Sequence, residues 1–181
     1  NLIGRCRVSD PNCVPGSEFN GGQVEITGVE FSALHAMSLP ASIELEVALS
    51  YTYTESEFGE TFLSGFSQWG LVREGDELPY VPEHIGNLRV SYARNNWRVE
   101  GSVDFQSSMR EVPGIGEIAE DLHADDLTTV DLTFSYELTE ALTLQGSLLN
   151  ATDEAAIVSH RPFGARPNRP RALIGRIKYR F

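Results

Sequence analysis

Apolar and polar residues alternate with a period of two along most of the chain, which is typical of β-strands. In 171–181 one face is apolar and aromatic, whereas the other carries Arg176, Lys178 and Arg180. The same alternation recurs in six earlier segments: 24–37, 43–53, 88–93, 97–106, 129–137 and 141–150. Helical spacing is hard to find, so the sequence predicts an all-β fold with seven strands.

The alternation changes phase inside the first of these segments. Val24 and Ile26 have the opposite parity from Val29 and Phe31. Because one extra residue in a strand exchanges its two faces, we expect a β-bulge at Gly28.

The lengths of the strands and of their connections favour a membrane barrel. Most strands reach roughly 10 residues, whereas globular strands usually have about 5 or 6 and a tilted membrane strand needs about 9 to 11. Short and long connections alternate along the chain: 38–42, 56–83, 95–96, 109–128, 138–140 and 151–170. Tight turns at one end and long loops at the other are typical of outer-membrane barrels.

Two of the short connections predict a strand register. A two-residue turn at Asn95-Asn96 pairs Arg94 with Trp97 and places all the apolar partners of that hairpin on one face. A three-residue turn at 138–140 pairs Tyr136 with Leu142 in the same way.

The distribution of charge indicates which face is which. The apolar faces carry no charged residue in their middles, whereas the opposite faces carry many, among them Glu44, Glu46, Arg89, Arg98 and Glu100. An Arg or Lys on the lipid face at the bilayer midplane costs about 2–4 kcal/mol, so we expect the charged faces to line a wet or plugged interior. A soluble β-sandwich with a solvent-exposed polar face is the alternative.

Composition narrows the class of protein further. The 181 residues fit one domain, and a net charge of −12 argues against nucleic-acid binding. The sequence contains no run of 18 apolar residues, so no membrane-spanning helix is predicted. Bacterial single-chain barrels have an even number of strands, so we expect these seven to be the C-terminal third or so of a larger barrel.

The only two cysteines lie close together near the start of the chain. Cys6 and Cys13 would form a disulfide in an oxidising compartment; two free thiols or, less simply, a metal site are the alternatives. We therefore divide the chain into an external loop, 1–23, that carries this disulfide, and barrel strands with their external loops, 24–181.

Several short motifs carry a resemblance to a known family. They are Gly28-Val29-Glu30, Tyr80-Val81-Pro82-Glu83-His84 with 87–92 after it, 149–153, 161–171 and the terminal Tyr179-Arg180-Phe181. Together they resemble the C-terminal part of TonB-dependent outer-membrane receptors, which import ferric siderophores and similar scarce nutrients. Ala151 and Asn168 depart from the residues that the family usually has there, an apolar Leu or Phe and a Gly.

The resemblance implies an antiparallel transmembrane β-barrel of 22 strands, closed by a plug domain that this chain lacks. The implied location is the outer membrane of a Gram-negative bacterium. The implied partners are the rest of the receptor, in the same chain or as a separate chain, the TonB complex through the plug, a ferric siderophore or similar ligand, and lipid with lipopolysaccharide. The alternative functions are a passive porin-like or adhesion barrel and, in third place, a soluble all-β binding module.

Arginine and aromatic side chains in the long loops suit an anionic ferric siderophore. The candidates for ligand binding are Trp69, Arg73, Tyr80, Arg110, Arg161, Phe163 and Arg166. Each of them could instead pair with a neighbouring acid or with lipopolysaccharide phosphate. The acidic run at 117–126 lacks the spacing of a calcium loop, and the four histidines do not cluster, so we expect no metal, no cofactor and no catalytic residue.

Overall fold

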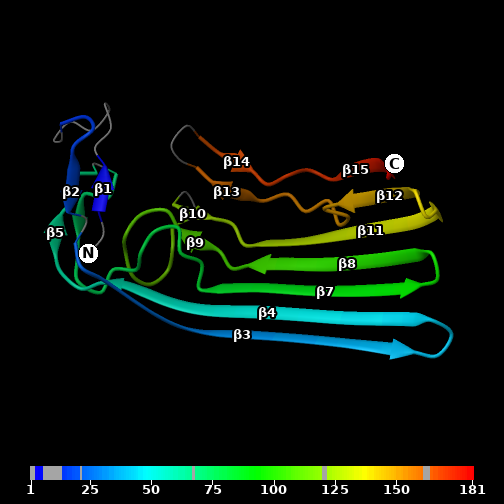
Figure 1. Ribbon diagram of the computed structural model, residues 1–181. Helices are drawn as coiled ribbons and strands as arrows, with labels where there is room; N and C mark the ends of the chain where they lie inside the picture. Colours follow the sequence, from blue (N-terminus) through cyan, green and yellow to red (C-terminus); the bar gives the residue numbers. More distant parts are fainter. Residues whose placement is uncertain (1–2, 6–13, 21, 67, 120–121, 161–163) are drawn as a thin grey trace.

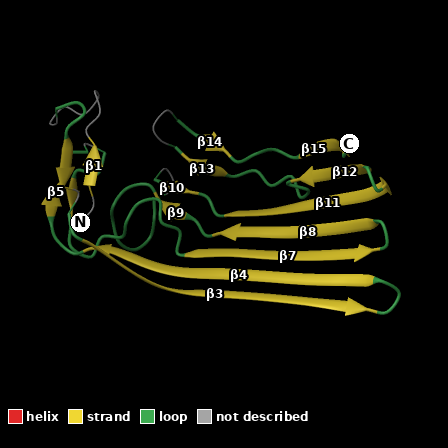
Figure 2. Ribbon diagram, in the orientation of Figure 1, coloured by secondary structure: helices red, strands yellow, loops and turns green. Residues whose placement is uncertain are grey.

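The computed structural model describes residues 3–5, 14–20, 22–66, 68–119, 122–160 and 164–181, and in these residues the chain is all-β (Figures 1 and 2). The described part contains no helix that is long and apolar enough to cross a membrane. Seven strands form one antiparallel sheet in the order β15-β12-β11-β8-β7-β4-β3, which confirms the predicted fold class. The bounds are β3 Val24–Leu39, β4 Ile43–Phe58, β7 His84–Arg94, β8 Trp97–Gln106, β11 Leu127–Thr139, β12 Leu142–Leu149 and β15 Ala172–Tyr179.

Among the described residues, four two-stranded pairs lie outside this sheet. They are β1 Ile3–Arg5 with β2 Glu18–Asn20, β5 Phe62–Leu63 with β6 Leu71–Val72, β9 Met109–Arg110 with β10 His123–Ala124, and β13 Ile157–Ser159 with β14 Arg166–Pro167. Three of them lie within the predicted long connections. Cys6 and Cys13 fall outside the described residues, so their disulfide stays a prediction.

The tight turns and the long connections lie at opposite ends of the sheet, the turn end and the loop end (Figure 1). The strand lengths change across the sheet. The pair β3 and β4 has 16 residues in each strand, whereas β12 and β15 have 8 each. Because the turns stand side by side at one end, the longer strands extend further at the loop end.

The register of one tight turn confirms the sequence prediction, and that of another corrects it. Arg94 pairs with Trp97 across Asn95-Asn96, and Asn95 has a φ of 53°. In the β11–β12 hairpin, however, Tyr136 pairs with Leu144 and not with Leu142, so the predicted register was wrong by two residues.

Thr139 explains the difference in the β11–β12 hairpin. Its hydroxyl accepts hydrogen bonds from the amides of Ala141 and Leu142, at 3.3 and 3.1 Å. This side chain closes a tighter turn and extends β11 to Thr139, and the pairing shifts between Glu137 and Thr139 to accommodate it.

The predicted bulge at Gly28 is also wrong. Residues 24–39 pair with 43–58 in one unbroken register. A Cβ on Gly28 would lie 2.4 Å from the carbonyl oxygen of Tyr53, so glycine permits a close approach of two strands. The change of parity has another cause: Val24 lies opposite Phe58 and packs against the apolar cluster of a long loop.

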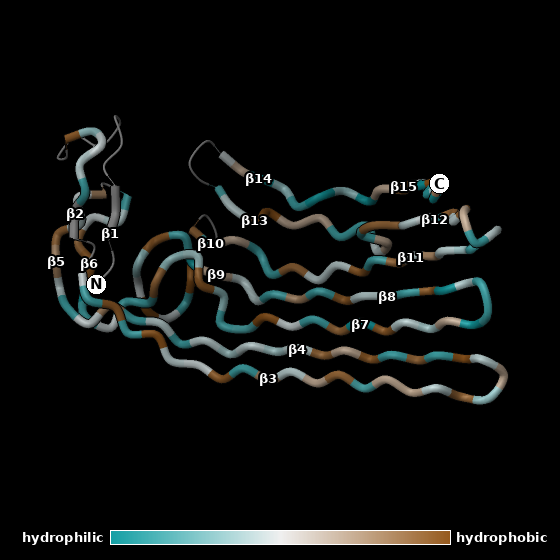
Figure 3. The backbone as a smooth tube through the Cα atoms, viewed as in Figure 1, coloured by the Kyte–Doolittle hydropathy of each residue, from teal (hydrophilic) through white to brown (hydrophobic). Residues whose placement is uncertain are grey.

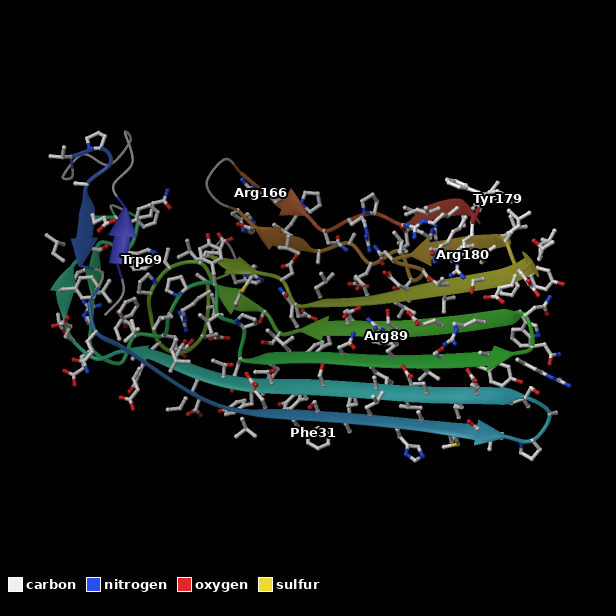
Figure 4. The ribbon with its side chains drawn as sticks, in the orientation of Figure 1. Phe31, Trp69, Arg89, Arg166, Tyr179 and Arg180 are labelled. Carbon is white, nitrogen blue, oxygen red and sulfur yellow. The ribbon has the colours of Figure 1, made fainter. Side chains whose placement is uncertain are left out.

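The two faces of the sheet have the predicted opposite character. Hydrophobic and hydrophilic residues follow one another along the long strands (Figure 3). One face, the outer face, exposes large apolar side chains such as Phe31, Phe134 and Ile177, of which Phe31 is labelled in Figure 4. Aromatic pairs lie near both ends of this face: Tyr51 with His84 at the loop end, and Tyr92 with Trp97 at the turn end. Such aromatic girdles mark the two membrane interfaces of a barrel.

The inner face carries paired charges and polar ladders. Arg89 lies 3.7 Å from Glu100, and Arg98 lies 3.8 Å from Glu44. The second pair crosses an intervening strand, because Ala93 stands between the two residues in the register and is too small to separate them. This face fits the predicted barrel interior, although the described sheet is open and β3 and β15 form its edges.

Candidate functional site

The three long loops at the loop end form the candidate site. They are 59–83, between β4 and β7, 107–126, between β8 and β11, and 150–171, between β12 and β15. We call them the first, second and third loop. The sequence placed all the ligand-binding candidates in them.

A small apolar core shapes the first loop. Phe58, Val72 and Leu78 are buried, and Phe62 and Trp69 pack against them. The ring centroid of Trp69 lies 5.7 Å from that of Phe58 in an edge-to-face arrangement, which is a stabilising geometry for aromatic pairs. Trp69 is therefore only partly exposed, and it holds the loop together (Figure 4).

The other two candidates in the first loop face outward. Arg73 is exposed on a turn that Asp76 closes by accepting a 2.8 Å hydrogen bond from the Arg73 amide. Tyr80 is 41% exposed and has a φ of 61°, an uncommon value for a bulky residue. Its amide donates to the carbonyl oxygen of Arg110 at 2.9 Å, which fixes Tyr80 beside the second loop.

Arg110 joins the first loop to the second. Its side chain is only 6% exposed, and its Nε donates to Glu77 Oε2 at 2.7 Å. A second guanidinium nitrogen donates to the carbonyl oxygen of Gly116 at 3.0 Å. The backbone completes the junction, because the Glu77 amide donates to Gly114. In this arrangement the guanidinium of Arg110 binds the loops to each other.

A second junction joins the second loop to the third. The Asp125 amide donates to the carbonyl oxygen of Ile157 at 2.9 Å, and the Asp125 carboxylate accepts from the Ile157 amide at 2.6 Å. The carboxylate of Glu111 is 1% exposed; it accepts from the His160 amide at 2.6 Å and lies 3.5 Å from the imidazole. Sequence reasoning did not find these residues, because nothing in the local pattern shows which distant loop a side chain meets.

Asn150 fixes the base of the third loop. It is 1% exposed and has a φ of 49°. Its side-chain amide donates to the carbonyl oxygens of Glu154 and Arg169, both at 2.9 Å, and its side-chain oxygen accepts from the Glu154 amide. Two ion pairs, Arg169 with Asp131 and Arg171 with Asp153, lie in the same region. The family-like motif at 149–153 is thus a structural latch.

The remaining candidates belong to the third loop. Arg166 is exposed on β14 (Figure 4). Arg161 and Phe163 lie outside the described residues.

Carboxylates line a cavity of about 430 Å³ where the first loop leaves the sheet. Its acidic lining residues are Glu25, Glu55, Glu57, Glu77 and Glu83. An anionic ligand would be repelled there, whereas Arg73 and Arg166 are exposed cations in the first and third loops. Within the described residues, no three His, Cys, Asp or Glu side chains converge as a metal site would require.

Comparisons with known proteins agree with this architecture. The sequence model of the family described as "TonB dependent receptor-like, beta-barrel" matches residues 1–151. The chain is 26% identical over 144 residues to the iron-regulated outer membrane virulence protein of Vibrio cholerae serotype O1, which is 77% of this chain and 19% of that protein.

Two solved structures have a similar fold. The ferric-catecholate import receptor Fiu from K12 E. coli is 20% identical with a TM-score of 0.70, over 100% of this chain and 23% of that one. The ferric citrate transporter FecA in the unliganded form is 21% identical with a TM-score of 0.73, over 99% of this chain and 27% of that one. The chain thus spans about a fifth to a quarter of the length of these relatives.

Proposed function

Because the chain belongs to the family of TonB-dependent receptor-like β-barrels, we propose that it is the C-terminal barrel portion of a transporter that imports a ferric siderophore. Energy would be supplied by TonB, through a plug domain in another part of the receptor. Membership in this family also confirms the predicted location in the outer membrane of a Gram-negative bacterium. Receptors of this family are transporters, which is consistent with the expectation that no residue is catalytic.

The observation that carries the proposal is the joining of the three external loops into one unit. Arg110 links the first loop to the second, and Asp125 and Glu111 link the second to the third. A receptor needs such a pre-formed surface, since ordering loose loops on binding would cost affinity. A passive pore does not need it.

The names of the relatives support iron as the cargo. One is iron-regulated, one imports a ferric catecholate and one transports ferric citrate. Ferric chelates of this kind are commonly anionic, and guanidinium groups are suitable donors for them. We propose Arg73, Tyr80 and Arg166 as ligand contacts, together with Arg161 and Phe163, and we assign Trp69 and Arg110 to positioning the loops.

Growth under iron starvation tests this function. The full-length receptor is expressed in a strain that lacks its own siderophore receptors, with ferric catecholates, ferric hydroxamates and ferric citrate offered one at a time. We expect one class to restore growth and to promote uptake of radioactive iron. Deletion of tonB should abolish both.

Control measurements separate the alternatives. Uptake that persists without TonB would favour a passive porin-like barrel, and binding to host surfaces without uptake would favour an adhesion barrel. A protein that stays soluble without detergent would contradict the proposal that it is a membrane barrel. An Arg73→Ala, Arg166→Ala variant should take up the same chelate with a higher half-saturation concentration, at an unchanged amount of folded receptor.

A further inference from the structure

The strand β15 has a backbone edge that no described strand of this chain fills. One side of β15 pairs with β12, and in the described sheet its other side has no neighbour. An unpaired strand edge in a membrane leaves amides and carbonyls without hydrogen bonds, so another strand must lie there. The directions of the strands then restrict which strand can pair with β15.

All neighbouring strands in the sheet are antiparallel, so the first and the seventh, β3 and β15, run in the same direction. The edge of β3 therefore offers β15 only a parallel pairing. A second copy in the same membrane would have the same orientation, and its β15 would be parallel as well. The missing neighbour is a strand that runs from the turn end to the loop end and lies outside this sheet.

The positive charges on the inner face of β15 indicate the chemistry of that neighbouring strand. Arg176 and Lys178 occupy alternate positions on this face, Arg180 continues the alternation directly after the strand, and Lys178 is the only lysine of the chain. Figure 4 shows Arg180 and Tyr179 on opposite sides of the sheet. On the β12 side the partners of Arg176 and Lys178 are Gln145 and Thr143, which carry no charge.

The three cations differ from the other cations of the inner face. Arg89 and Arg98 each have a carboxylate from another residue of the wall within 4 Å. Among the described residues, none of these three cations has such a carboxylate, and like charges on alternate positions lie only about 7 Å apart. Their counter-charge must come from the side of the free edge or from the barrel interior.

We propose that the strand that pairs with β15 carries carboxylates on its inner face, opposite Arg176, Lys178 and Arg180. Side chains directly opposite each other in an antiparallel pair are close enough for such ion pairs. The alternating cations thus specify both the partner and its register, because a shift by one residue would turn the carboxylates to the lipid side. This inference rests on the proposed function only in taking the chain as part of a larger membrane receptor.

Site-specific photo-crosslinking in the full-length receptor tests the proposal. The reporter p-benzoylphenylalanine replaces Lys178, cells are irradiated, and the linked peptides are identified by mass spectrometry. We expect a link to a barrel strand with Asp or Glu at alternate positions. A link only to the plug or to lipopolysaccharide, or to a strand with neutral residues there, would overturn the proposal. The reporter at Thr143 is the matched control, and it should link β12 to its neighbours β11 and β15.

Charge exchange provides a second, independent readout. The temperature at which the folded barrel opens is followed by its shift in gel mobility after heating in dodecyl sulfate. We expect Lys178→Glu to lower this temperature by several degrees and Lys178→Gln to lower it less. A lysine in place of the facing carboxylate should restore stability to Lys178→Glu.

Failure of that rescue would contradict the proposed pairing. Neither readout depends on transport. A receptor that imports no ferric chelate but passes both tests would therefore refute the proposed function alone.

Discussion

Replacing Arg110 with alanine is expected to loosen the first and second loops together. The side chain is 6% exposed and makes two hydrogen bonds, to Glu77 and to Gly116. Hydrogen bonds that involve a charged group each contribute about 1.5–3 kcal/mol. Because the Glu77 side chain is 52% exposed and is rehydrated when its partner is lost, we take the lower part of the range.

Only the bond to Glu77 crosses between the two loops, so we expect a loss of about 1.5–2 kcal/mol in the free energy of opening this junction. Since about 1.4 kcal/mol is a factor of ten, the open form should become about 10- to 30-fold more populated. Amide hydrogen exchange of the full-length receptor, read by mass spectrometry, measures this directly. The reporting amides are those of Glu77 and Tyr80, which donate across the junction, and that of Glu111.

Two control variants sharpen the measurement. Arg73→Ala removes an exposed arginine from the same loop and should leave exchange at Glu77 and Tyr80 unchanged. Arg110→Lys keeps the charge but cannot reach Glu77 and Gly116 together, so it should fall between the wild type and Arg110→Ala. Equal exchange in the wild type and in Arg110→Ala would refute the assignment of Arg110 as the link between the loops.

Three further perturbations follow from the fold. Asn150→Ala removes the side chain that fixes the base of the third loop, and Asn150→Asp loses both of its donors, so each variant should lower the opening temperature of the barrel. An unchanged opening temperature in heated gel samples would argue against this role of Asn150. Gly28→Ala places a Cβ 2.4 Å from the Tyr53 carbonyl and should reduce the folded fraction in the membrane, whereas Gly146→Ala meets open space and should not. Phe134→Arg on the outer face should cost about 2–4 kcal/mol in urea unfolding within lipid, and Ser135→Arg on the inner face far less; equal costs would mean that the faces are misassigned.

The sheet could be predicted from the sequence because its pattern is local. The alternation of apolar and polar residues predicts the strands and their two faces, and the Asn95-Asn96 turn predicts the register of its hairpin correctly. The β11–β12 register was missed because the hydroxyl of one residue, Thr139, tightens the turn, and alternation is unchanged by a shift of two residues. The predicted bulge at Gly28 is a change of environment instead, since Val24 packs against the apolar core of the first loop.

The loops could be predicted only as a list of chemically suitable residues. An arginine that binds a ligand and an arginine that binds a neighbouring loop look the same in a sequence. Arg110 and Arg73 differ only in what surrounds them, which is decided by segments more than 30 residues away, such as the one that carries Glu77. The positions of Glu111 and Asp125 depend on contacts of the same long range.

The graded strand lengths make the described sheet taller at its β3 edge than at its β15 edge. At about 3.3 Å per residue, the 16-residue strands β3 and β4 are about 25 Å longer than the 8-residue strands β12 and β15. The β3–β4 hairpin therefore extends the hydrogen-bonded sheet beyond the ends of β12 and β15, where the third loop continues in place of strands (Figure 1). Since loops tolerate substitutions and insertions better than paired strands do, this is the part of the wall whose sequence can change most freely.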